Sequence, residues 1–303
     1  MNIMIAADKN YFFPAVTLIV SLFHNHPDKK IILYFLCSGF SQEEYIRLEK
    51  LEKRYENKQI ICLDITEEQT KGLHSFGRFS VGAFYRILAL DMIPEEVDRI
   101  LYLDVDMVVT RDISELFEAA MEKPVWVCYD INNYLQGNIE YHKNNAGLGK
   151  DAPYFNSGMI LFDMKYVREN NTKDVLIKDI QCNFDRYKLV DQDALNRYYQ
   201  GNCEFIPWEI YNCPCVPYIS TVPVYQKQGQ LAAYAKIKEW KEKEDASRLY
   251  DVTTDILNRA SIIHFCTEMK PWKDRNFYLE NANLQSGYRI YSRFERLAER
   301  LLR

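Results

Sequence analysis

The chain has 303 residues, of which 48% are hydrophobic and 14% aromatic, and a formal net charge of −5. This length suits one large domain or two smaller ones, and the acidic balance argues against a protein built mainly to bind nucleic acid. None of its eight cysteines forms a Cys-x-x-Cys pair, so we expect free thiols in a reducing, cytoplasmic compartment. The first residues lack the basic start of a signal peptide, so none is expected.

The first third of the chain alternates between predicted strands and helices. Apolar runs predict strands at residues 3–7, 31–37 and 59–65, with helices at about 14–24 and 41–55 between them. The second helix opens with the capping box Ser41-Gln-Glu-Glu44. Such alternation predicts right-handed βαβ units, so we expect an α/β fold with a mostly parallel central sheet.

Residues 99–109 predict one buried strand that two carboxylates interrupt. Asp104 and Asp106 stand two positions apart in the apolar run, and side chains at i and i+2 of an extended chain point the same way. Ionised carboxylates at one spot repel each other and favour a hard divalent cation such as Mg²⁺, Mn²⁺ or Ca²⁺. The alternative is a strand end whose Asp residues cap the next helix or face solvent, and Asp-x-Asp alone does not decide between them.

The rest of the chain is less regular. Further strands are predicted at 125–129, 158–163 and 261–265, and helices at about 83–92, 171–187, 192–199, 236–259 and 288–302. Residues 131–153 predict a long surface loop, and residues 203–235 are irregular and rich in Pro and Tyr. We expect one domain over residues 1–280 with a less regular C-terminal part. Residues 281–303 predict a basic amphipathic helix that either packs on the domain or lies on a membrane surface, with an apolar face of Ile290, Phe294, Leu297 and Leu301.

Polar residues end several predicted strands: Asp8, Asp104, Asp106, Asp130 and His264. Ligands of open α/β sheets bind beyond the carboxyl ends of the strands, so we expect these side chains to line one cleft. His264 would complete a three-ligand metal site with the two carboxylates, although a His in this position is more often a hydrogen-bonded structural residue. Arg86 and Lys270 are candidate counter-charges for phosphate, with ordinary surface charge as the alternative.

Six ordered segments, spread over about residues 1–275, carry a family resemblance. They are Ile3-Met-Ile-Ala-Ala-Asp-Lys-Asn10, Phe84-Tyr-Arg-Ile87, Leu101-Tyr-Leu-Asp-Val-Asp106, Tyr154-Phe-Asn-Ser-Gly158, Asp191-Gln-Asp-Ala-Leu-Asn196 and His264-Phe-Cys-Thr-Glu-Met-Lys-Pro-Trp272. Together they resemble glycosyltransferase family 8, which includes bacterial lipopolysaccharide galactosyl- and glucosyltransferases and is related to glycogenin. The resemblance implies a GT-A (Rossmann-like) fold. It also implies a retaining, Mn²⁺-dependent enzyme, with Mg²⁺ as an alternative, that moves galactose or glucose from a UDP-sugar to a glycan or glycolipid acceptor such as lipopolysaccharide or a cell-surface polysaccharide.

The resemblance also implies roles for individual residues. Metal ligation is implied for Asp104, Asp106 and His264. UDP binding is implied for Ala6, Ala7, Asp8, Asn10, Arg86, Asp104, Val105, Asp106, His264 and Lys270, with Asp8 facing the uracil and Asn10 the ribose. The donor-sugar wall would comprise Arg86, Asp130, Asn156, Ser157, Asp191 and Gln192.

The implied chemistry centres on Gln192, which would lie beside the anomeric carbon. A neutral amide is a poor nucleophile, so we favour attack by the acceptor on the face that UDP leaves, with a phosphate oxygen taking the acceptor's proton. Asp191 and Asp130 are the alternative nucleophiles. One position departs from the family pattern His-x-x-Gly-x-x-Lys-Pro-Trp, because Thr267 replaces a Gly that would let the backbone approach phosphate closely.

Two other function classes fit part of the pattern. The run Leu101-Tyr-Leu-Asp-Val-Asp-Met-Val108 also fits the nucleophile motif of haloacid-dehalogenase-like phosphatases, but that motif usually lies near the N-terminus and needs a later acidic pair, and this chain has no Asp-Asp. A non-catalytic sugar-nucleotide-binding protein is the third possibility. The expected partners are a UDP-hexose and a glycan or glycolipid acceptor, without nucleic acid. The expected location is the cytoplasm or the inner face of the membrane.

Overall fold

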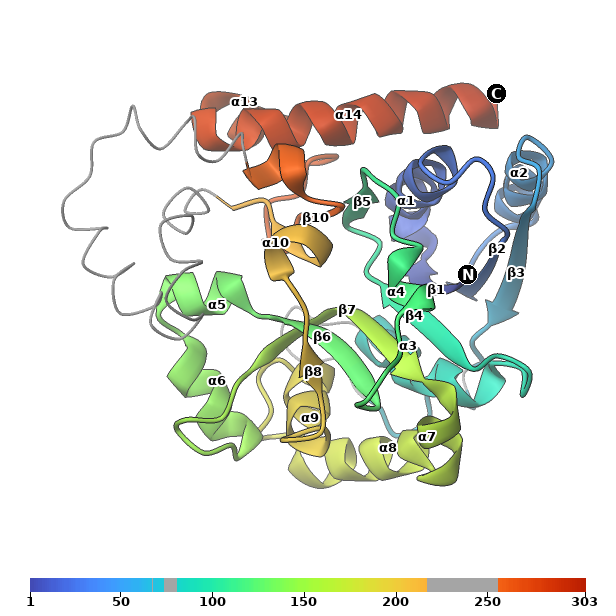
Figure 1. Cartoon of the computed structure of the whole chain (residues 1–303). Helices are drawn as coiled ribbons and strands as arrows, with labels where there is room; N and C mark the ends of the chain where they lie inside the picture. Colours follow the sequence, from blue (N-terminus) through green and yellow to red (C-terminus); the bar gives the residue numbers. More distant parts are fainter. Residues whose placement is uncertain (67, 74–80, 217–255) are drawn as a thin grey trace.

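The computed structural model describes residues 1–66, 68–73, 81–216 and 256–303. Within these residues a seven-stranded sheet has the order β3-β2-β1-β4-β7-β6-β8, and a three-stranded sheet has the order β5-β10-β9 (Figure 1). The large sheet contains β1 (Asn2–Asp8), β2 (Ile31–Ser38), β3 (Lys58–Asp64), β4 (Arg99–Leu103), β6 (Val125–Tyr129), β7 (Phe155–Asp163) and β8 (Glu204–Phe205). The small sheet contains β5 (Met107–Val109), β9 (Cys213–Pro214) and β10 (Ile262–His264).

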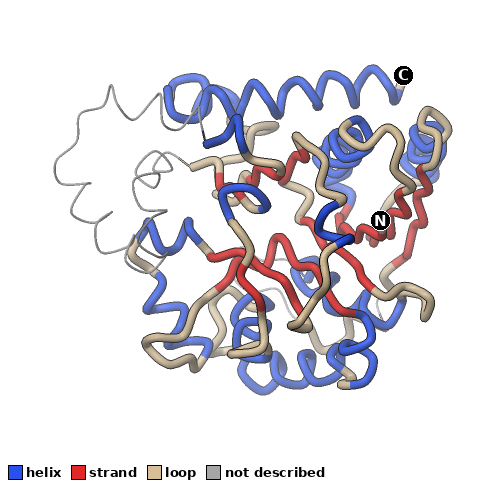
Figure 2. Tube along the Cα trace, in the orientation of Figure 1, coloured by secondary structure: helices blue, strands red, loops and turns tan. Residues whose placement is uncertain are grey.

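Helices cover both faces of the large sheet (Figure 2). One face carries η1 (Lys9–Tyr11), α1 (Phe12–His24) and α2 (Gln42–Glu52). Beyond them, α14 (Ala282–Leu302) packs on α1 and α2, and α13 (Arg275–Glu280) packs on α14. The other face carries η2 (Val81–Phe84), α3 (Tyr85–Leu88), η3 (Ala89–Met92), α7 (Met164–Glu169), α8 (Thr172–Asn183) and α9 (Asp191–Tyr198). The remaining helices are α4 (Glu115–Glu118), α5 (Ile131–Gln136), α6 (Ile139–Ala146) and α10 (Trp208–Tyr211).

The central strands are apolar throughout because both of their faces are buried. In β1, Ile3 and Ile5 join the cluster that contains α1 and α14, whereas Met4 joins the cluster that contains α3 and α9. This two-residue alternation is the pleat of an extended strand, and burial on both faces removes the need for polar positions. The predicted α/β fold with a mostly parallel sheet is therefore confirmed.

Strand β7 runs against its neighbours. It pairs antiparallel with β4 and with β6, whereas β1–β2, β1–β4, β2–β3 and β6–β8 are parallel. The strand also starts at Phe155, three residues before the predicted start. Because β7 is reversed, its first residues, Asn156 and Ser157, lie at the sheet edge where the parallel strands end.

Two sequence-based expectations were wrong. Residues 99–109 form two strands joined by a turn at Asp104–Asp106, because the chain leaves the large sheet there and β5 pairs with β10 in the small one. Residues 131–153 contain α5 and α6 instead of a long loop. The Asp130 side chain caps α5 by accepting a hydrogen bond from Asn133 N, and Gly137 ends it in the left-handed conformation at φ 77°. Buried Tyr134 and Ile139 then pack with Tyr154.

The C-terminal helix α14 packs along α1 at the top of the view in Figure 1. It begins six residues before the predicted start, and its buried side recurs at helical spacing through Leu284, Tyr288, Tyr291, Phe294 and Ala298. Of the predicted apolar face, Ile290, Leu297 and Leu301 are only partly buried. No helix among the described residues is long and apolar enough to cross a membrane. The predicted helix at 236–259 lies outside the described residues as far as 255, and a division of the chain at residue 280 stays a prediction.

Candidate metal and nucleotide-sugar site

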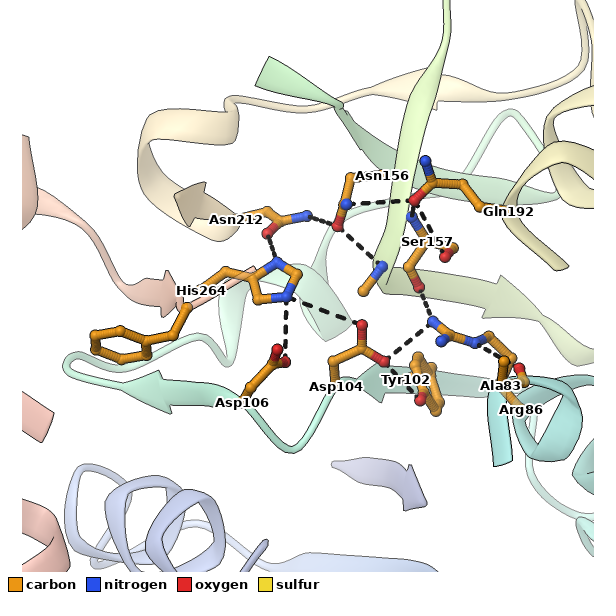
Figure 3. Close-up of polar contacts among 12 residues, drawn as sticks. Ala83, Arg86, Tyr102, Asp104, Asp106, Asn156, Ser157, Gln192, Asn212 and His264 are labelled. Carbon is orange, nitrogen blue, oxygen red and sulfur yellow. Dashed lines mark hydrogen bonds and ion pairs between the residues drawn. The ribbon is translucent and has the colours of Figure 1, made fainter. Parts of the chain in front are cut away.

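The side chains of Asp104, Asp106 and His264, called the metal group below, converge between the two sheets (Figure 3). Asp104 and Asp106 come from the turn between β4 and β5, and His264 ends β10 beside them, where it pairs with Met107. One potential ligand atom from each of the three lies within 4.8 Å of the others. His264 therefore reaches the carboxylates from the small sheet, instead of from a strand end of the large sheet as the sequence suggested.

Each carboxylate is held through one oxygen and leaves the other facing His264 Nε2. Asp104 Oδ1 accepts a hydrogen bond of 2.7 Å from the Tyr102 hydroxyl, and its Oδ2 lies 3.9 Å from Nε2. Asp106 Oδ2 accepts a bond of 2.6 Å from Lys270 Nζ, and its Oδ1 lies 3.2 Å from Nε2. Two carboxylate oxygens and an imidazole nitrogen suit Mn²⁺ or Mg²⁺, so these residues fit the predicted metal.

The Lys270 ammonium supplies the nearest positive charge to this group. Besides Asp106 it contacts the Phe265 carbonyl at 2.7 Å. Burial alone would raise the pKa of Asp106, but contacts with the Lys270 ammonium and the His264 ring outweigh it and hold that pKa below its usual value. Burial likewise opposes the charge on Lys270, yet the ion pair with Asp106 leaves its pKa raised. A buried carboxylate at this position is thus stabilised by a cation.

Arg86 lies in the centre of the site and connects the metal group to α9. It is 7% exposed, and its guanidinium contacts Asp104 Oδ1 at 3.1 Å and Asp191 Oδ2 at 2.9 Å. The same group donates to the Ser157 carbonyl and stacks on the Tyr102 ring, 4.5 Å from its centroid. Burial disfavours this charge, but Asp104 and Asp191 outweigh it and raise the pKa of Arg86 further. The ordinary surface-charge alternative for Arg86 therefore fails.

Three cavities adjoin one another here, and the first two are lined by residues of the metal group. The first, of about 230 Å³, is lined by Ala6, Ala7, Asp8, Tyr11, Gly82, Ala83, Tyr85, Arg86, Tyr102, Asp104, Val105 and Asp106. The second, of about 510 Å³, shares Tyr11, Arg86, Asp104 and Asp106, and adds Ser157, Leu189, Gln192, His264, Cys266, Thr267, Glu268, Lys270 and Lys273. The third, of about 290 Å³, shares Leu189, Gln192, Cys266, Thr267 and Glu268, and adds Asp130, Asn132, Asn133 and Gln136. Most of the predicted site residues line this series of cavities.

Three predicted site residues do not line these cavities. Asn10 is exposed on η1, where its backbone N–H donates to Asp8 Oδ1 at 2.8 Å. Asn156 is turned into contacts within the protein, and Asp191 is 3% exposed. Burial raises the pKa of Asp191 to about 6 even though Arg86 lowers it. The predicted ribose contact of Asn10 and the sugar contacts of Asn156 and Asp191 stay predictions.

Gln192 and Asp130 meet at the wall between the second and third cavities. Gln192 Oε1 accepts hydrogen bonds from Ser157 N at 2.9 Å and from Asn156 Nδ2 at 3.3 Å, and its Nε2 donates to Asp130 Oδ2 at 2.8 Å. Asp130 also accepts bonds from the backbone and the side chain of Asn133. Asp130 therefore caps α5 and also lines the third cavity.

A strained backbone segment presents Asp191 and Gln192. The preceding residue, Val190, has φ 44° and ψ −101°, a costly conformation for a β-branched side chain. Fully buried Asp193 braces this turn, because its Oδ2 accepts bonds from the backbone N–H groups of Lys188 at 2.7 Å and Leu189 at 2.9 Å. The first turn of α9 is thus held in one geometry beside the cavities.

The sequence-based predictions missed two residues that contact the metal group, Gly158 and Asn212. A Cβ on Gly158 would lie 2.6 Å from His264 Cε1 and 2.8 Å from Asp104 Oδ2, so only glycine fits between them. Asn212, which follows α10, holds the other side of the His264 ring through a contact of 2.8 Å between its Oδ1 and Nδ1. Gly158 lay in a recognised segment, and its spacing gave no sign of this role. Asn212 lay in a segment without a periodic pattern.

The unusual Thr267 lines the second and third cavities. Its hydroxyl donates to the Met269 carbonyl at 3.0 Å. This hydrogen bond joins two residues of the loop between β10 and Lys270, and a glycine at position 267 could not form it.

The chain is similar to known proteins over most of its length. Residues 2–276 match the family described as Glycosyl transferase family 8. The lipopolysaccharide 1,3-galactosyltransferase of Salmonella typhimurium is 27% identical over 208 residues, which cover 68% of this chain and 61% of that protein. A lipopolysaccharide 1,2-glucosyltransferase of Escherichia coli is 25% identical over 95% of this chain and 78% of its own length. The chain thus spans less than two thirds of the Salmonella relative.

Solved structures give the same fold. A crystal structure of the galactosyltransferase LgtC, in complex with donor and acceptor sugar analogs, superposes with a TM-score of 0.73 at 19% identity, covering 97% of this chain and 95% of that one. This likeness identifies the fold as GT-A.

Proposed function

The chain belongs to glycosyl transferase family 8, and from this membership we propose that it moves a hexose, galactose or glucose, from a UDP-sugar to a glycan or glycolipid acceptor. We further propose that transfer needs a divalent cation and retains the anomeric configuration. The relatives that act on lipopolysaccharide support a cell-surface glycan as the acceptor.

One observation carries the metal dependence. Asp104 Oδ2, Asp106 Oδ1 and His264 Nε2 face one another, and the other oxygen of each carboxylate is already held by Tyr102 or Lys270. A divalent cation held by these three ligands would neutralise charge on the departing diphosphate as a Lewis acid.

The series of cavities suits the donor. We place the uridine in the first cavity against Ala6, Ala7 and Asp8, because this cavity lies beyond the carboxyl end of β1. The diphosphate then lies where the first and second cavities share Asp104 and Asp106. Arg86, whose charge is stabilised by Asp104 and Asp191, and Lys270 supply preorganised positive charge there.

The donor sugar and the acceptor would meet at Gln192. This residue belongs to both the second and the third cavity, and the third is lined by amide and carboxylate side chains that suit the hydroxyls of a glycan. Hydrogen bonds from Ser157 and to Asp130 fix the Gln192 amide. The acceptor hydroxyl would approach from the third cavity.

The contacts of the candidate nucleophiles support attack on the face that UDP leaves. Both oxygens of Asp130 accept hydrogen bonds, from Asn133 and Gln192, so a nucleophilic Asp130 would have to break them. Asp191 is 3% exposed and paired with Arg86. Gln192 carries no charge and is a poor nucleophile. The acceptor's proton then passes to the departing phosphate oxygen. A sugar trapped covalently on either Asp would refute this mechanism.

The C-terminal helix is proposed as a secondary contact with an anionic membrane surface. Its outer side exposes Arg289, Arg293, Arg296 and Arg300, while its apolar side packs on α1. Basic helices of this kind bind anionic lipid mainly through charge. Failure of the protein to bind anionic vesicles at low salt would remove this proposal.

The primary test is a panel of UDP-sugars with Mn²⁺, with UDP release measured in the presence and absence of glycan acceptors. We expect UDP-galactose or UDP-glucose to be turned over, chelator to stop the reaction, and Mn²⁺ to restore it. Asp106→Asn should abolish transfer in a folded protein, whereas Asp28→Asn at an exposed site should not. Wild-type turnover by Asp106→Asn would refute the metal site. UDP-sugar binding without turnover would favour the non-catalytic alternative, and the family membership gives the phosphatase alternative no support.

A further inference from the structure

The side chain of Asn212 bridges two parts of the site from a buried position. It is 4% exposed and lies between α10 and β9. Its Oδ1 lies 2.8 Å from His264 Nδ1, and its Nδ2 donates to Asn156 Oδ1 at 2.9 Å (Figure 3). Both polar atoms of one amide are therefore used, each on a different site residue.

The direction of every amide in this chain of contacts follows from backbone donors. Gly158 N–H can only donate, so the Asn156 atom 3.0 Å away must be the acceptor Oδ1. That atom faces Asn212, so Asn212 presents its NH₂ group there and turns its carbonyl oxygen to His264. An oxygen acceptor 2.8 Å from Nδ1 requires a proton on Nδ1.

A second backbone donor fixes the far end of the chain independently. Ser157 N–H donates to Gln192 Oε1, which leaves Asn156 to donate its NH₂ group to the same oxygen. This gives Asn156 the orientation that Gly158 requires. The two anchors agree, so the polarity of the chain from Gln192 to His264 is determined.

We propose that Asn212 is a positioning residue that holds His264 in the tautomer with the proton on Nδ1, and so keeps the Nε2 lone pair directed at Asp104 and Asp106. This inference rests on the proposed metal site. Histidine ligands commonly depend on such a partner for tautomer and ring orientation. Neutral histidine side chains in water prefer the proton on Nε2, so the ligand form has to be imposed.

The backbone around Asn212 supports this role. Strands β9 and β10 run parallel with Cys213 opposite Ile263 and Pro214 opposite His264, and Cys215 N donates to the His264 carbonyl at 2.8 Å. Asn212 N donates to the Trp208 carbonyl at 3.0 Å. The two side chains thus project from paired segments with little freedom to separate.

An amide suits this position better than a carboxylate. It supplies the acceptor for Nδ1–H without adding a third negative charge beside Asp104 and Asp106, and its NH₂ group satisfies Asn156. In an Asn212→Asp variant the acceptor for His264 remains, while two oxygens face each other at Asn156. In Asn212→Leu both contacts are lost at similar volume.

The test measures tautomer and metal affinity in the same variants. Long-range ¹H–¹⁵N spectra of metal-free protein with labelled histidine, recorded above the ordinary pKa of imidazole, report which ring nitrogen carries the proton. His264→Ala identifies the signal. Calorimetric titration with Mn²⁺ reports affinity. The control is Asn25→Leu, which removes another bridging amide, the one that donates to the carbonyls of Ser21 and Val109.

We expect the wild-type His264 to carry its proton on Nδ1. Asn212→Leu should move the proton to Nε2 and weaken Mn²⁺ binding roughly 10- to 100-fold. Asn212→Asp should keep the proton on Nδ1 and bind Mn²⁺ within a few-fold of the wild-type affinity. Asn25→Leu should match wild type in both measurements. An Asn212→Leu protein with an unchanged tautomer and unchanged Mn²⁺ affinity would overturn the proposal. If the wild type binds no Mn²⁺ but the tautomer shifts as expected, the metal site fails and the positioning role of Asn212 stands.

Discussion

Replacing Arg86 with methionine gives the sharpest test of the electrostatics of the site. The substitution keeps an unbranched apolar stem and removes the guanidinium that lies between Asp104 and Asp191. Buried Asp191 and partly buried Asp104 would then lose the cation that they share. Removing one partner of a buried ion pair typically costs about 3–5 kcal/mol of stability, and we expect a loss of this size in metal-free protein.

The state of Asp191 makes this loss depend on pH. Its pKa is about 6 even beside Arg86, because burial raises it more than the guanidinium lowers it. Between the ordinary pKa of an aspartate and about 6, the native state binds more protons than the unfolded state, so this group adds stability as pH falls through that range. Without Arg86 the pKa of Asp191 rises further, so the deficit of Arg86→Met should be largest near neutral pH and shrink in mild acid.

Urea denaturation in chelator, at about pH 7.5 and about pH 5.5, measures both effects. Arg168→Met is the control, because Arg168 donates to the backbone carbonyls of Pro94 at 2.7 Å and Val97 at 3.1 Å, so it should lose about 1–2 kcal/mol with little pH dependence. The double variant Arg86→Met/Asp191→Asn should recover much of the loss. A single variant within about 1 kcal/mol of wild type, or a double variant no more stable than the single one, would refute the reasoning.

Three further predictions concern the metal group and the core. Gly158→Ala puts a methyl group 2.6 Å from a metal-ligand ring, so Mn²⁺ affinity by calorimetry and kcat/KM should both fall, whereas Gly149→Ala, with no atom within 4 Å, should change neither. Lys270→Met removes the cation that occupies Asp106, so nucleotide-free protein should bind Mn²⁺ more tightly while transfer is lost; weaker binding would contradict this. Burial lowers the pKa of His26, and both of its ring nitrogens contact backbone atoms. The contribution of His26 to stability should therefore decline as pH falls below about 6.5. His26→Gln should make that decline smaller in urea titrations.

The sequence predicted the members of the metal group better than their arrangement. Asp104, Asp106 and His264 were identified from polar residues that end apolar runs and from the family resemblance, and the structure brings all three together. The expected geometry was an unbroken strand with two carboxylates on one side. Their actual convergence depends on a turn between two sheets, and nothing in a run of apolar residues announces that its two halves pair with different partners.

Non-local pairing also explains what else was missed. The reversal of β7 places Asn156 and Ser157 beside the ends of parallel strands, and it is fixed by antiparallel partners on both sides. Asn212 lies between a four-residue helix, α10, and a two-residue strand, β9, and both are too short to show periodicity. Helices α5 and α6 were a different error. Their signals were present in the capping Asp130 and the terminal Gly137, but helices of six and eight residues show too little repeat to stand out in a polar segment.

The small sheet makes the metal group sensitive to register. Strands β5 and β10 share three residue pairs, and Phe265 N donates to the Asp106 carbonyl at 2.9 Å directly beyond them. Because successive side chains of a strand alternate between its two faces, a slip of one residue would turn His264 away from the carboxylates. Such short strands hold their register poorly alone. Here Val108, Ile262 and Ile263 are buried in the same hydrophobic cluster as α1, which packs against β5, and this burial fixes the register. The hydrophobic core that stabilises the fold therefore also sets the distance between His264 and the carboxylates.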